Sequence, residues 1–165
     1  MKKYELTAEF IEQWGKKLFR IKALISFGSV EAGELGGYVE KEDNLAQDDD
    51  AWVHGNAWVY GNARVYGNAE VCGNAEVCGN ADYLLIGRIG SRFSFTTFFK
   101  NKDKGITVSC GCFLGTIAEF RAKVTDTHGN NKHAKMYNLA ADMAELQILG
   151  EEHFDKLNTN KSEPF

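Results

Sequence analysis

The hydrophobic and polar positions of this chain follow a six-residue repeat through its middle. Five units run without interruption from Ala51 to Asn80 and read AWVHGN, AWVYGN, ARVYGN, AEVCGN and AEVCGN. In each unit Ala and Val are two positions apart, so both point to one face of a strand and the residue between them points to the other. The Gly-Asn pair that follows tolerates the positive φ of a sharp bend. Each unit is therefore predicted to form a short strand and a corner.

This pattern resembles the hexapeptide repeat of left-handed parallel β-helices. In that family three units make one triangular coil of about 18 residues. The resemblance implies a short β-helix of about two to three coils over residues 33–86, in which residues 18 apart are stacked, such as Trp52 with Glu70. Val39 and Leu45 are also six apart but lie two residues out of step with Val53, which predicts a bulge in the segment 48–50.

The flanking segments predict other elements. Residues 1–32 read as strands that cap the open end of the repeat, because solenoid ends expose unpaired strand edges. Residues 87–150 read as an α+β module of a few strands and two helices, which begin at the capping box Thr116–Glu119 and at Asn131. Residues 151–165 are polar, contain the single proline and are expected to be a flexible tail. The predicted fold class is mainly β with this α+β C-terminal part.

Charge is distributed unevenly along the chain, although the net charge is only −4. Residues 1–82 carry 8 Lys and Arg against 14 Asp and Glu, whereas residues 83–135 carry 9 against 3. Cations interleaved with aromatic residues can hold a nucleotide or another anion. The predicted ligand-binding residues in this basic block are Arg88, Ser91, Arg92, Lys100 and Lys102. The same cations can equally face the acidic half of a neighbouring subunit, or form a solvated face above a core of Phe side chains.

The outward positions of the repeat suggest a partner surface. Trp52, Trp58, Tyr60 and Tyr66 form a girdle of aromatic side chains if all of them face solvent. The alternative is that the terminal segments of the chain fold back over them.

Two thiols and two imidazoles form a candidate zinc site. Cys110 and Cys112 are expected to share one face of a strand, and His128 and His133 flank the junction of the two predicted helices. Such a set could complete a tetrahedral site. The alternative is two small thiols in the core and two histidines at helix ends.

The N-terminus has no apolar run long enough for a signal peptide or a membrane span. We therefore expect a cytoplasmic protein, without membrane association, whose four cysteines are thiols or ligands rather than a disulfide framework.

A wider resemblance covers most of residues 17–149. IKALISFGSVEAGELGGYVEKEDNLAQ, and later LLIGRIGSR, TTFF, CGCFLGTIAEFRAKV, THG and HAK, resemble bacterial and prophage hexapeptide-repeat proteins often labelled transferases or polymer-forming proteins. The resemblance implies a small accessory phage or prophage protein with a counter-defence role in the host cell. It assigns no catalytic residue.

Three functions from different classes remain open. The first is a non-enzymatic protein that binds or sequesters an anionic ligand such as a nucleotide, or a host protein. The second is an acyltransferase that uses coenzyme A and His54, the one histidine in the repeat. The third is a structural module that polymerises with copies of itself through the ends of its coils. Separately, the β-helix resemblance implies a homotrimer.

Overall fold

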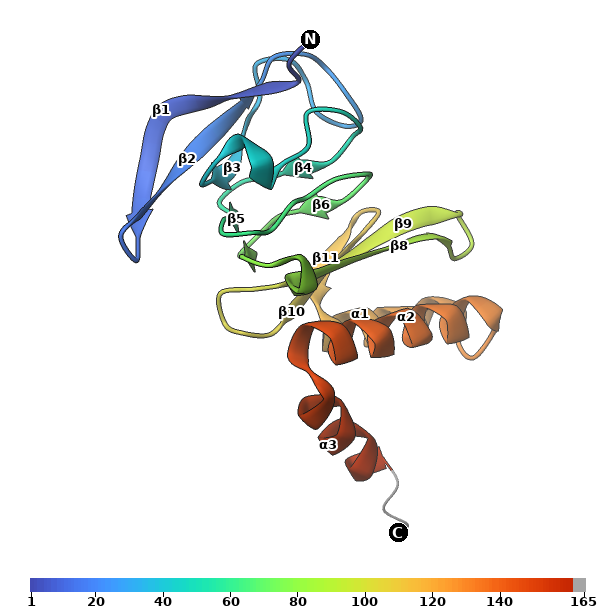
Figure 1. Cartoon of the computed structure of the whole chain (residues 1–165). Coiled ribbons are helices and arrows are strands. Elements are labelled where there is room, and N and C mark those ends of the chain that lie inside the picture. Colours follow the sequence, from blue (N-terminus) through green and yellow to red (C-terminus); the bar gives the residue numbers. More distant parts are fainter. Residues whose placement is uncertain (162–165) are drawn as a thin grey trace.

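The structure is a computed structural model that describes residues 1–161. Figure 1 shows an N-terminal hairpin and the repeat above a second sheet, with the helices below that sheet. The strands are β1 (Tyr4–Gln13), β2 (Lys16–Ala23), β3 (Leu35–Val39), β4 (Trp52–Val53), β5 (Trp58–Val59), β6 (Glu70–Val71), β7 (Glu76–Val77), β8 (Tyr83–Ile89), β9 (Ser94–Lys100), β10 (Ile106–Cys110) and β11 (Phe113–Thr116). The helices are α1 (Ile117–His128), α2 (Lys132–Leu149) and α3 (Glu151–Lys161).

The predicted fold class, a mainly β protein built on a left-handed parallel β-helix, is wrong. The structure is a mixed α/β protein. Its sheets have the strand orders β1-β2-β3-β5-β7, β11-β10-β9-β8 and β4-β6. No sheet in residues 1–161 is coiled, and the strands are not arranged as a parallel β-helix. The physical reason is that each repeat strand is only two residues long, whereas the flanking segments contribute long antiparallel strands and helices.

The predicted spacing between paired residues is nevertheless confirmed. Trp52 pairs with Glu70, and Trp58 pairs with Glu76, both in parallel strands and 18 residues apart. Earlier in the chain the offset is 20, because Val39 pairs with Val59. The two additional residues fall in the segment 48–50, where Asp49 has a φ of 60°, so the predicted bulge is confirmed as well. The repeat valines are fully buried: Val53, Val59, Val65, Val71 and Val77.

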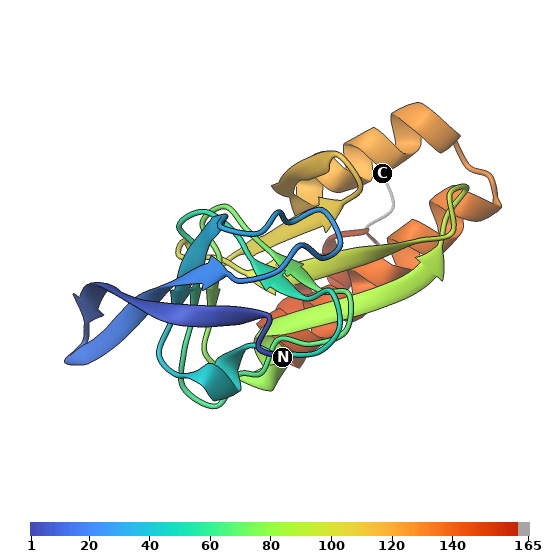
Figure 2. The same ribbon diagram turned by 90° about the horizontal axis from the view of Figure 1, so that it is seen from above.

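The N-terminal hairpin extends the sheet that the repeat begins. β2 pairs antiparallel with β3, and Figure 2 shows the hairpin projecting beyond the rest of the molecule. Just before β1, the buried Lys3 ammonium donates hydrogen bonds to the carbonyl oxygens of Asp48 (3.4 Å), Asp49 (3.2 Å) and Ala51 (2.8 Å). Because burial desolvates this ammonium, the pKa of Lys3 is lowered. These bonds fasten the start of the hairpin to the bulge.

The C-terminal part packs an antiparallel four-stranded sheet against α1 and α2 around a second core. Both predicted helix starts are confirmed. The Glu119 N–H donates to Thr116 Oγ1 at 3.2 Å, and the Thr116 N–H donates to Glu119 Oε2 at 2.9 Å. At the start of α2, the Ala134 N–H donates to Asn131 Oδ1 at 3.1 Å. These caps fix where α1 and α2 begin relative to the sheet.

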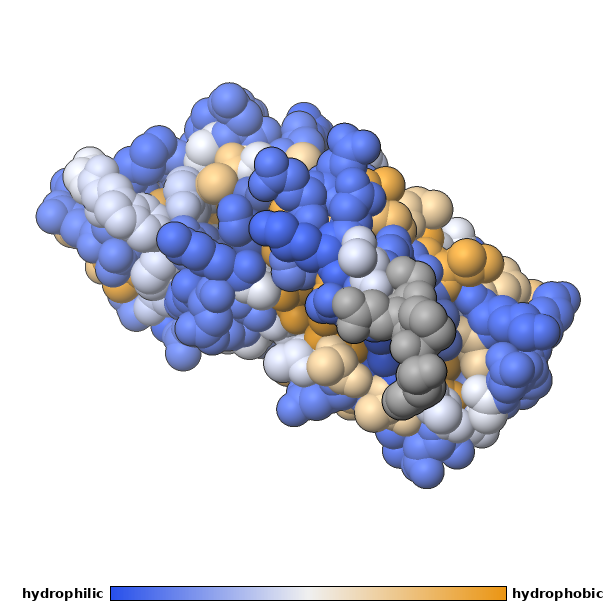
Figure 3. Space-filling view, turned by 90° about the horizontal axis from the view of Figure 1, so that it is seen from below, coloured by the Kyte–Doolittle hydropathy of each residue, from blue (hydrophilic) through white to orange (hydrophobic). Residues whose placement is uncertain are grey.

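Helix α3 occupies most of the segment that was expected to be a flexible tail, and residues 162–165 lie outside the described residues. The molecule seen from below has hydrophobic side chains gathered mainly on the half where the helices lie (Figure 3). On α2, Leu139, Met143 and Leu146 are 66%, 52% and 43% exposed. This face of α2 is therefore apolar and open.

Candidate functional site

The five residues predicted to hold an anionic ligand do not lie together. Ser91 and Arg92 lie in the turn before β9, whereas Lys100 ends that strand and Lys102 follows it. The seven residues of β9 extend over about 20 Å, at roughly 3.3 Å per residue. The two groups of residues therefore lie at opposite ends of the sheet, and a small ligand cannot contact both.

The two lysines at the far end are engaged by the protein itself. Lys100 Nζ lies 3.9 Å from Asp82 Oδ1. Lys102 Nζ lies 3.7 Å from the centroid of the Trp58 ring and donates to the carbonyl oxygen of Asn56 at 3.1 Å. Burial lowers the pKa of this ammonium. Both side chains join the loop between β9 and β10 to the repeat, which is a structural task.

The near end of the sheet opens onto a hollow of about 240 Å³, here called the cationic hollow. It lies where the β8–β9 turn, the β10–β11 turn and the helices meet. No carboxylate side chain lines it, and two of its side chains are cations. The lining residues are Ser91, Arg92, Ser94, Cys110, Gly111, Cys112, Lys123, Thr127, His128 and Tyr137.

The two cations of this hollow have no ion-pair partner within residues 1–161. Arg92 and Lys123 have no salt bridge or side-chain hydrogen bond within residues 1–161, nor do the hydroxyls of Ser91 and Thr127. Arg88 lies outside the hollow, with its guanidinium carbon 5.6 Å from the centroid of the Phe95 ring. Because neither cation has a counter-charge in residues 1–161, a bound anion would accept their hydrogen bonds.

Tyr137 of α2 forms the floor of the cationic hollow. Gly90 has a φ of +80°, and a Cβ there would collide with the Tyr137 hydroxyl, so the close approach of the β8–β9 turn requires glycine. Burial, with the neighbouring Cys110 thiol, raises the pKa of the Tyr137 phenol. The phenol is therefore neutral and can donate a hydrogen bond. Its ring stacks on His128, with ring centroids 5.9 Å apart.

A smaller apolar hollow of about 100 Å³ adjoins the cationic one. Its apolar walls are Phe113, Phe120 and Val124, and it shares five lining residues with the cationic hollow, among them Cys110 and Tyr137. The two hollows together offer polar contacts to a charged group and apolar contacts to the part of a molecule that carries it.

Sequence analysis missed Lys123, Thr127 and Tyr137 as site residues. Lys123 follows the buried Phe120 by three positions and precedes the buried Val124, so it lies at the edge of the apolar face of α1. That position is a weak signal. Which end of the sheet this edge faces depends on how the helix packs, and a single sequence does not contain that information.

The predicted metal ligands come near one another without forming a metal site. Cys110, Cys112 and His128 line the cationic hollow, and the His128 and His133 rings have centroids 5.6 Å apart. However, Gly111 has a φ of 58° and reverses the chain, so the two thiols do not share a strand face as predicted. No group of three or more His, Cys, Asp or Glu side chains in residues 1–161 is placed to hold a metal ion. The arrangement thus gives the predicted zinc site no support.

Trp52 does not belong to a partner surface, and its prediction as such is wrong. It is fully buried. The rings of Tyr4 and Phe27 meet it edge-on, with centroids 6.1 Å and 5.4 Å away. The N-terminal segments have folded back over it, as the alternative interpretation expected.

The other three aromatic residues are covered to different extents. Trp58 is half-buried beneath Lys102 and Trp14, whose ring centroid lies 5.9 Å away. Tyr60 is half-buried, and its hydroxyl donates to Glu76 Oε1 at 2.7 Å. Tyr66 is 57% exposed. The predicted aromatic girdle is therefore not a continuous exposed surface.

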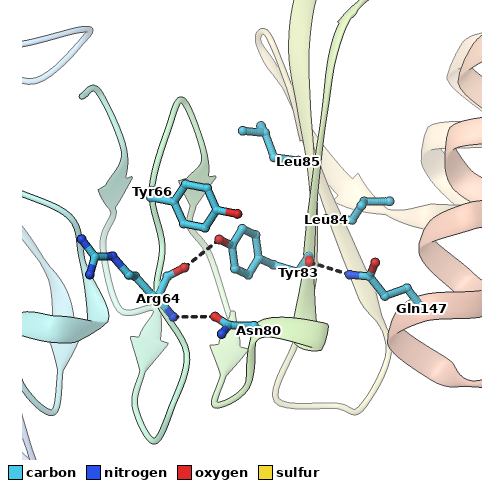
Figure 4. A pocket seen from close by; sticks show the side chains of 7 residues that line it. All are labelled: Arg64, Tyr66, Asn80, Tyr83, Leu84, Leu85 and Gln147. Atoms are coloured by element: carbon cyan, nitrogen blue, oxygen red, sulfur yellow. Dashed lines mark hydrogen bonds between the residues drawn. The ribbon is translucent and has the colours of Figure 1, made fainter. Parts of the chain in front are cut away.

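A larger hollow of about 480 Å³ lies between the repeat and the C-terminal module. Several of its polar groups are hydrogen-bonded to one another (Figure 4). The Tyr83 hydroxyl donates to the Arg64 carbonyl oxygen at 2.6 Å, and the Arg64 N–H donates to Asn80 Oδ1 at 2.9 Å. Gln147 Nε2 donates to the Tyr83 carbonyl oxygen at 2.9 Å. The Arg64 guanidinium points away from the Tyr83 ring in Figure 4. The hydrogen bonds in this hollow, here called the joint, hold the repeat against the C-terminal module. The smaller cationic hollow is therefore the better candidate for a ligand.

Comparison of the chain with protein-family models finds none that matches, and comparison with curated proteins finds no significant match. Within residues 1–161, no helix combines the length and the apolar character that crossing a bilayer requires. The four cysteines, Cys72, Cys78, Cys110 and Cys112, are free thiols.

Proposed function

We propose that this protein is a non-enzymatic binding protein that holds a small organic anion in the cationic hollow. The observation that supports the proposal most directly is the pair of cations, Arg92 and Lys123, which face one hollow with no ion-pair partner in residues 1–161 and no lining carboxylate. The neutral Tyr137 phenol and the Ser91 and Thr127 hydroxyls add hydrogen-bond donors to the same space.

The size and lining of the site favour an organic phosphate or carboxylate over a large polyanion. A hollow of about 240 Å³ is slightly smaller than ordinary ligand sites, which span about 300–1,000 Å³. The adjoining apolar hollow between Phe113 and Phe120 can receive a ring or an alkyl chain. A nucleoside monophosphate has both parts, and so does an alkyl phosphate.

Calorimetric titration with AMP and with hexyl phosphate tests the proposal. We expect both to bind, with affinity that falls as NaCl is raised, because salt screens exposed charges. Replacing Arg92→Gln should weaken binding at least tenfold, since one of two unpaired cations is lost. Tenfold corresponds to about 1.4 kcal/mol.

Arg88→Gln is the matched control. It removes the same charge four residues earlier, outside the hollow, and should leave both affinities unchanged. Circular dichroism establishes that each variant is folded. The absence of heat with both probes, or equal affinity in the wild type and Arg92→Gln, would overturn the proposal.

A second candidate function, self-assembly, is favoured by the exposed stripe of α2. Leu139, Met143 and Leu146 are spaced so that they share one helix face. We propose that a second copy of the chain covers this face; the homotrimer stays a prediction that rests on the β-helix resemblance. Native mass spectrometry should give one fixed oligomer mass for the wild type and the monomer mass for Met143→Glu. A monomeric wild type would contradict this assignment.

No structural observation favours the acyltransferase. His54 Nε2 is buried without a hydrogen-bond partner in residues 1–161, and the residue lines neither the cationic hollow nor the joint. The origin from a phage or prophage, the counter-defence role and the host cytoplasm as location stay predictions that rest on the resemblance.

A further inference from the structure

A second polar hollow lies on the opposite side of the same sheet. Its volume is about 250 Å³, and we call it the acidic hollow. It lies between the repeat and strands β9 and β10. Two carboxylates, Asp50 and Glu70, line it together with the hydroxyls of Thr97 and Ser109, and no Lys or Arg does so. The charge of its lining is thus opposite to that of the cationic hollow.

The two hollows meet at the end of the sheet. Ser94 and Gly111 line both of them. The reason is the unequal length of the two hairpins. β10 ends at Cys110, which pairs with Thr96, whereas the β8–β9 hairpin continues beyond this pair to the Ile89–Ser94 pair. The shorter hairpin leaves a step at the end of the sheet. At this step the cationic hollow, on the helix side of the sheet, meets the acidic hollow, on the repeat side, and a small molecule can extend from one hollow into the other.

The charges at the two ends of this groove are not neutralised by each other. Arg92 and Lys123 at one end, and Glu70 at the other, take part in no salt bridge within residues 1–161. Asp50 differs, because it adds to the attraction that acts on the Lys3 ammonium. Of the two carboxylates in the acidic hollow, Glu70 is therefore the one whose charge is less neutralised by a nearby cation.

A buried hydroxyl with remaining acceptor capacity also faces the acidic hollow. Thr97 is 2% exposed, and its Oγ1 accepts a hydrogen bond from the Glu70 N–H at 3.2 Å. No second donor to this oxygen lies within residues 1–161. A hydroxyl oxygen has two lone pairs, so Thr97 Oγ1 can also accept a hydrogen bond from a ligand in the acidic hollow.

We infer that the ligand is a zwitterion, that is, a small organic phosphate or carboxylate that also carries a primary ammonium group. This inference rests on the proposed function, since the anionic group binds Arg92 and Lys123 in the cationic hollow. The ammonium group crosses the step at Ser94 and Gly111 and lies beside Glu70 and Asp50. Each end of the ligand then meets the opposite charge, and neither Arg92 nor Glu70 is left without a partner.

Two matched pairs of probes test the inference by calorimetry. The first pair is 6-aminohexyl phosphate and hexyl phosphate, and the second is 2-aminoethyl phosphate and ethyl phosphate, so that two chain lengths are covered. In at least one pair, the compound with the amine should bind the wild type at least tenfold more tightly than the compound without it. Glu70→Gln should abolish this preference while leaving the affinity for the plain alkyl phosphate unchanged.

The repeat itself supplies the control. Glu76 occupies the same position in the next, identical unit but binds the Tyr60 hydroxyl and does not line the acidic hollow, so Glu76→Gln should keep the preference for the amine. Equal binding of both members in both pairs would overturn the zwitterion and leave the anion site standing. No binding of any of the four phosphates would overturn both proposals. A preference for the amine that survives in Glu70→Gln would remove Glu70 from the site.

Discussion

The units Ala69–Asn74 and Ala75–Asn80 have identical sequences and different surroundings. Their inward residues behave alike, since the valine of each unit is fully buried and pairs with a valine 18 residues earlier. Their outward residues differ. Glu70 lines the acidic hollow, whereas Glu76 accepts a hydrogen bond from the Tyr60 hydroxyl.

The cysteines of the two units differ in the same way. Cys72 is half-buried against the core of the repeat, and burial raises the pKa of its thiol. Cys78 is exposed, and its Sγ lies 3.2 Å from Asp82 Oδ2. The inward half of a unit therefore follows from the repeat alone. The outward half depends on which other segment of the chain packs beside it.

The prediction with the largest expected effect tests whether the inward-facing valines of the two units are equivalent. Val71→Asp and Val77→Asp each place a carboxylate in an apolar interior without a partner, and each should cost more than about 4 kcal/mol of unfolding free energy. Arg64→Ser, at an outward position, should cost less than about 0.5 kcal/mol. Urea unfolding followed by circular dichroism measures all three.

Milder variants keep this comparison measurable if the aspartates prevent folding. Val71→Ala and Val77→Ala should each cost about 2 kcal/mol. A clear difference between the two alanine variants would contradict the equivalence of the inward halves.

A smaller difference in unfolding free energy should distinguish the outward-facing residues of the two units, Glu70 and Glu76. Glu76→Gln should cost about 1 kcal/mol at pH 7, because the hydrogen bond from the Tyr60 hydroxyl loses its charged acceptor. Glu70→Gln should change the unfolding free energy by less than about 0.5 kcal/mol. Equal losses in the two variants would contradict the different surroundings of Glu70 and Glu76.

The pH dependence of the Glu76 variant follows from Tyr60. Burial, and then the hydrogen bond to Glu76, raise the pKa of the Tyr60 phenol in the folded protein. A raised pKa stabilises the fold fully below the unfolded pKa of about 10. That stability is lost as the pH rises further. Because burial keeps the Tyr60 pKa raised in Glu76→Gln as well, wild type and variant should lose stability in parallel between pH 10 and pH 11. The difference between them should therefore stay constant over this range, as urea unfolding at each pH can establish. A difference that grows or shrinks over this range would contradict the assignment.

Sequence reasoning predicted the features that depend on neighbours in sequence. The Val positions, the 18-residue pairing, the bulge near Asp49 and the caps at Thr116 and Asn131 all follow from local patterns, and the structure confirms them. The overall class was wrong because most of the chain lies outside the repeat, and the register of those segments depends on contacts between distant residues.

The candidate site was predicted only in part, for the same reason. Ser91 and Arg92 were identified, but Lys100 and Lys102 lie beyond the far end of an extended strand. The Trp58 ring comes from the repeat, and Asp82 directly follows it. Lys123 enters the site from α1. The cations of the basic block were predicted to form one site because they are close in sequence. In the structure the extended strand β9 places them at opposite ends of the sheet.

The offset of 18 residues between paired strands has a consequence for how this gene can change. Tandem units are prone to gain or loss of whole copies when DNA is replicated. Loss of one unit before Glu70 would remove six residues and shift the later repeat strands by one unit, so Glu70 would no longer be where Thr97 can meet it. Gain of three units would keep the 18-residue offset between paired strands and lengthen the repeat. Viable length variants of this protein should therefore differ by multiples of three units.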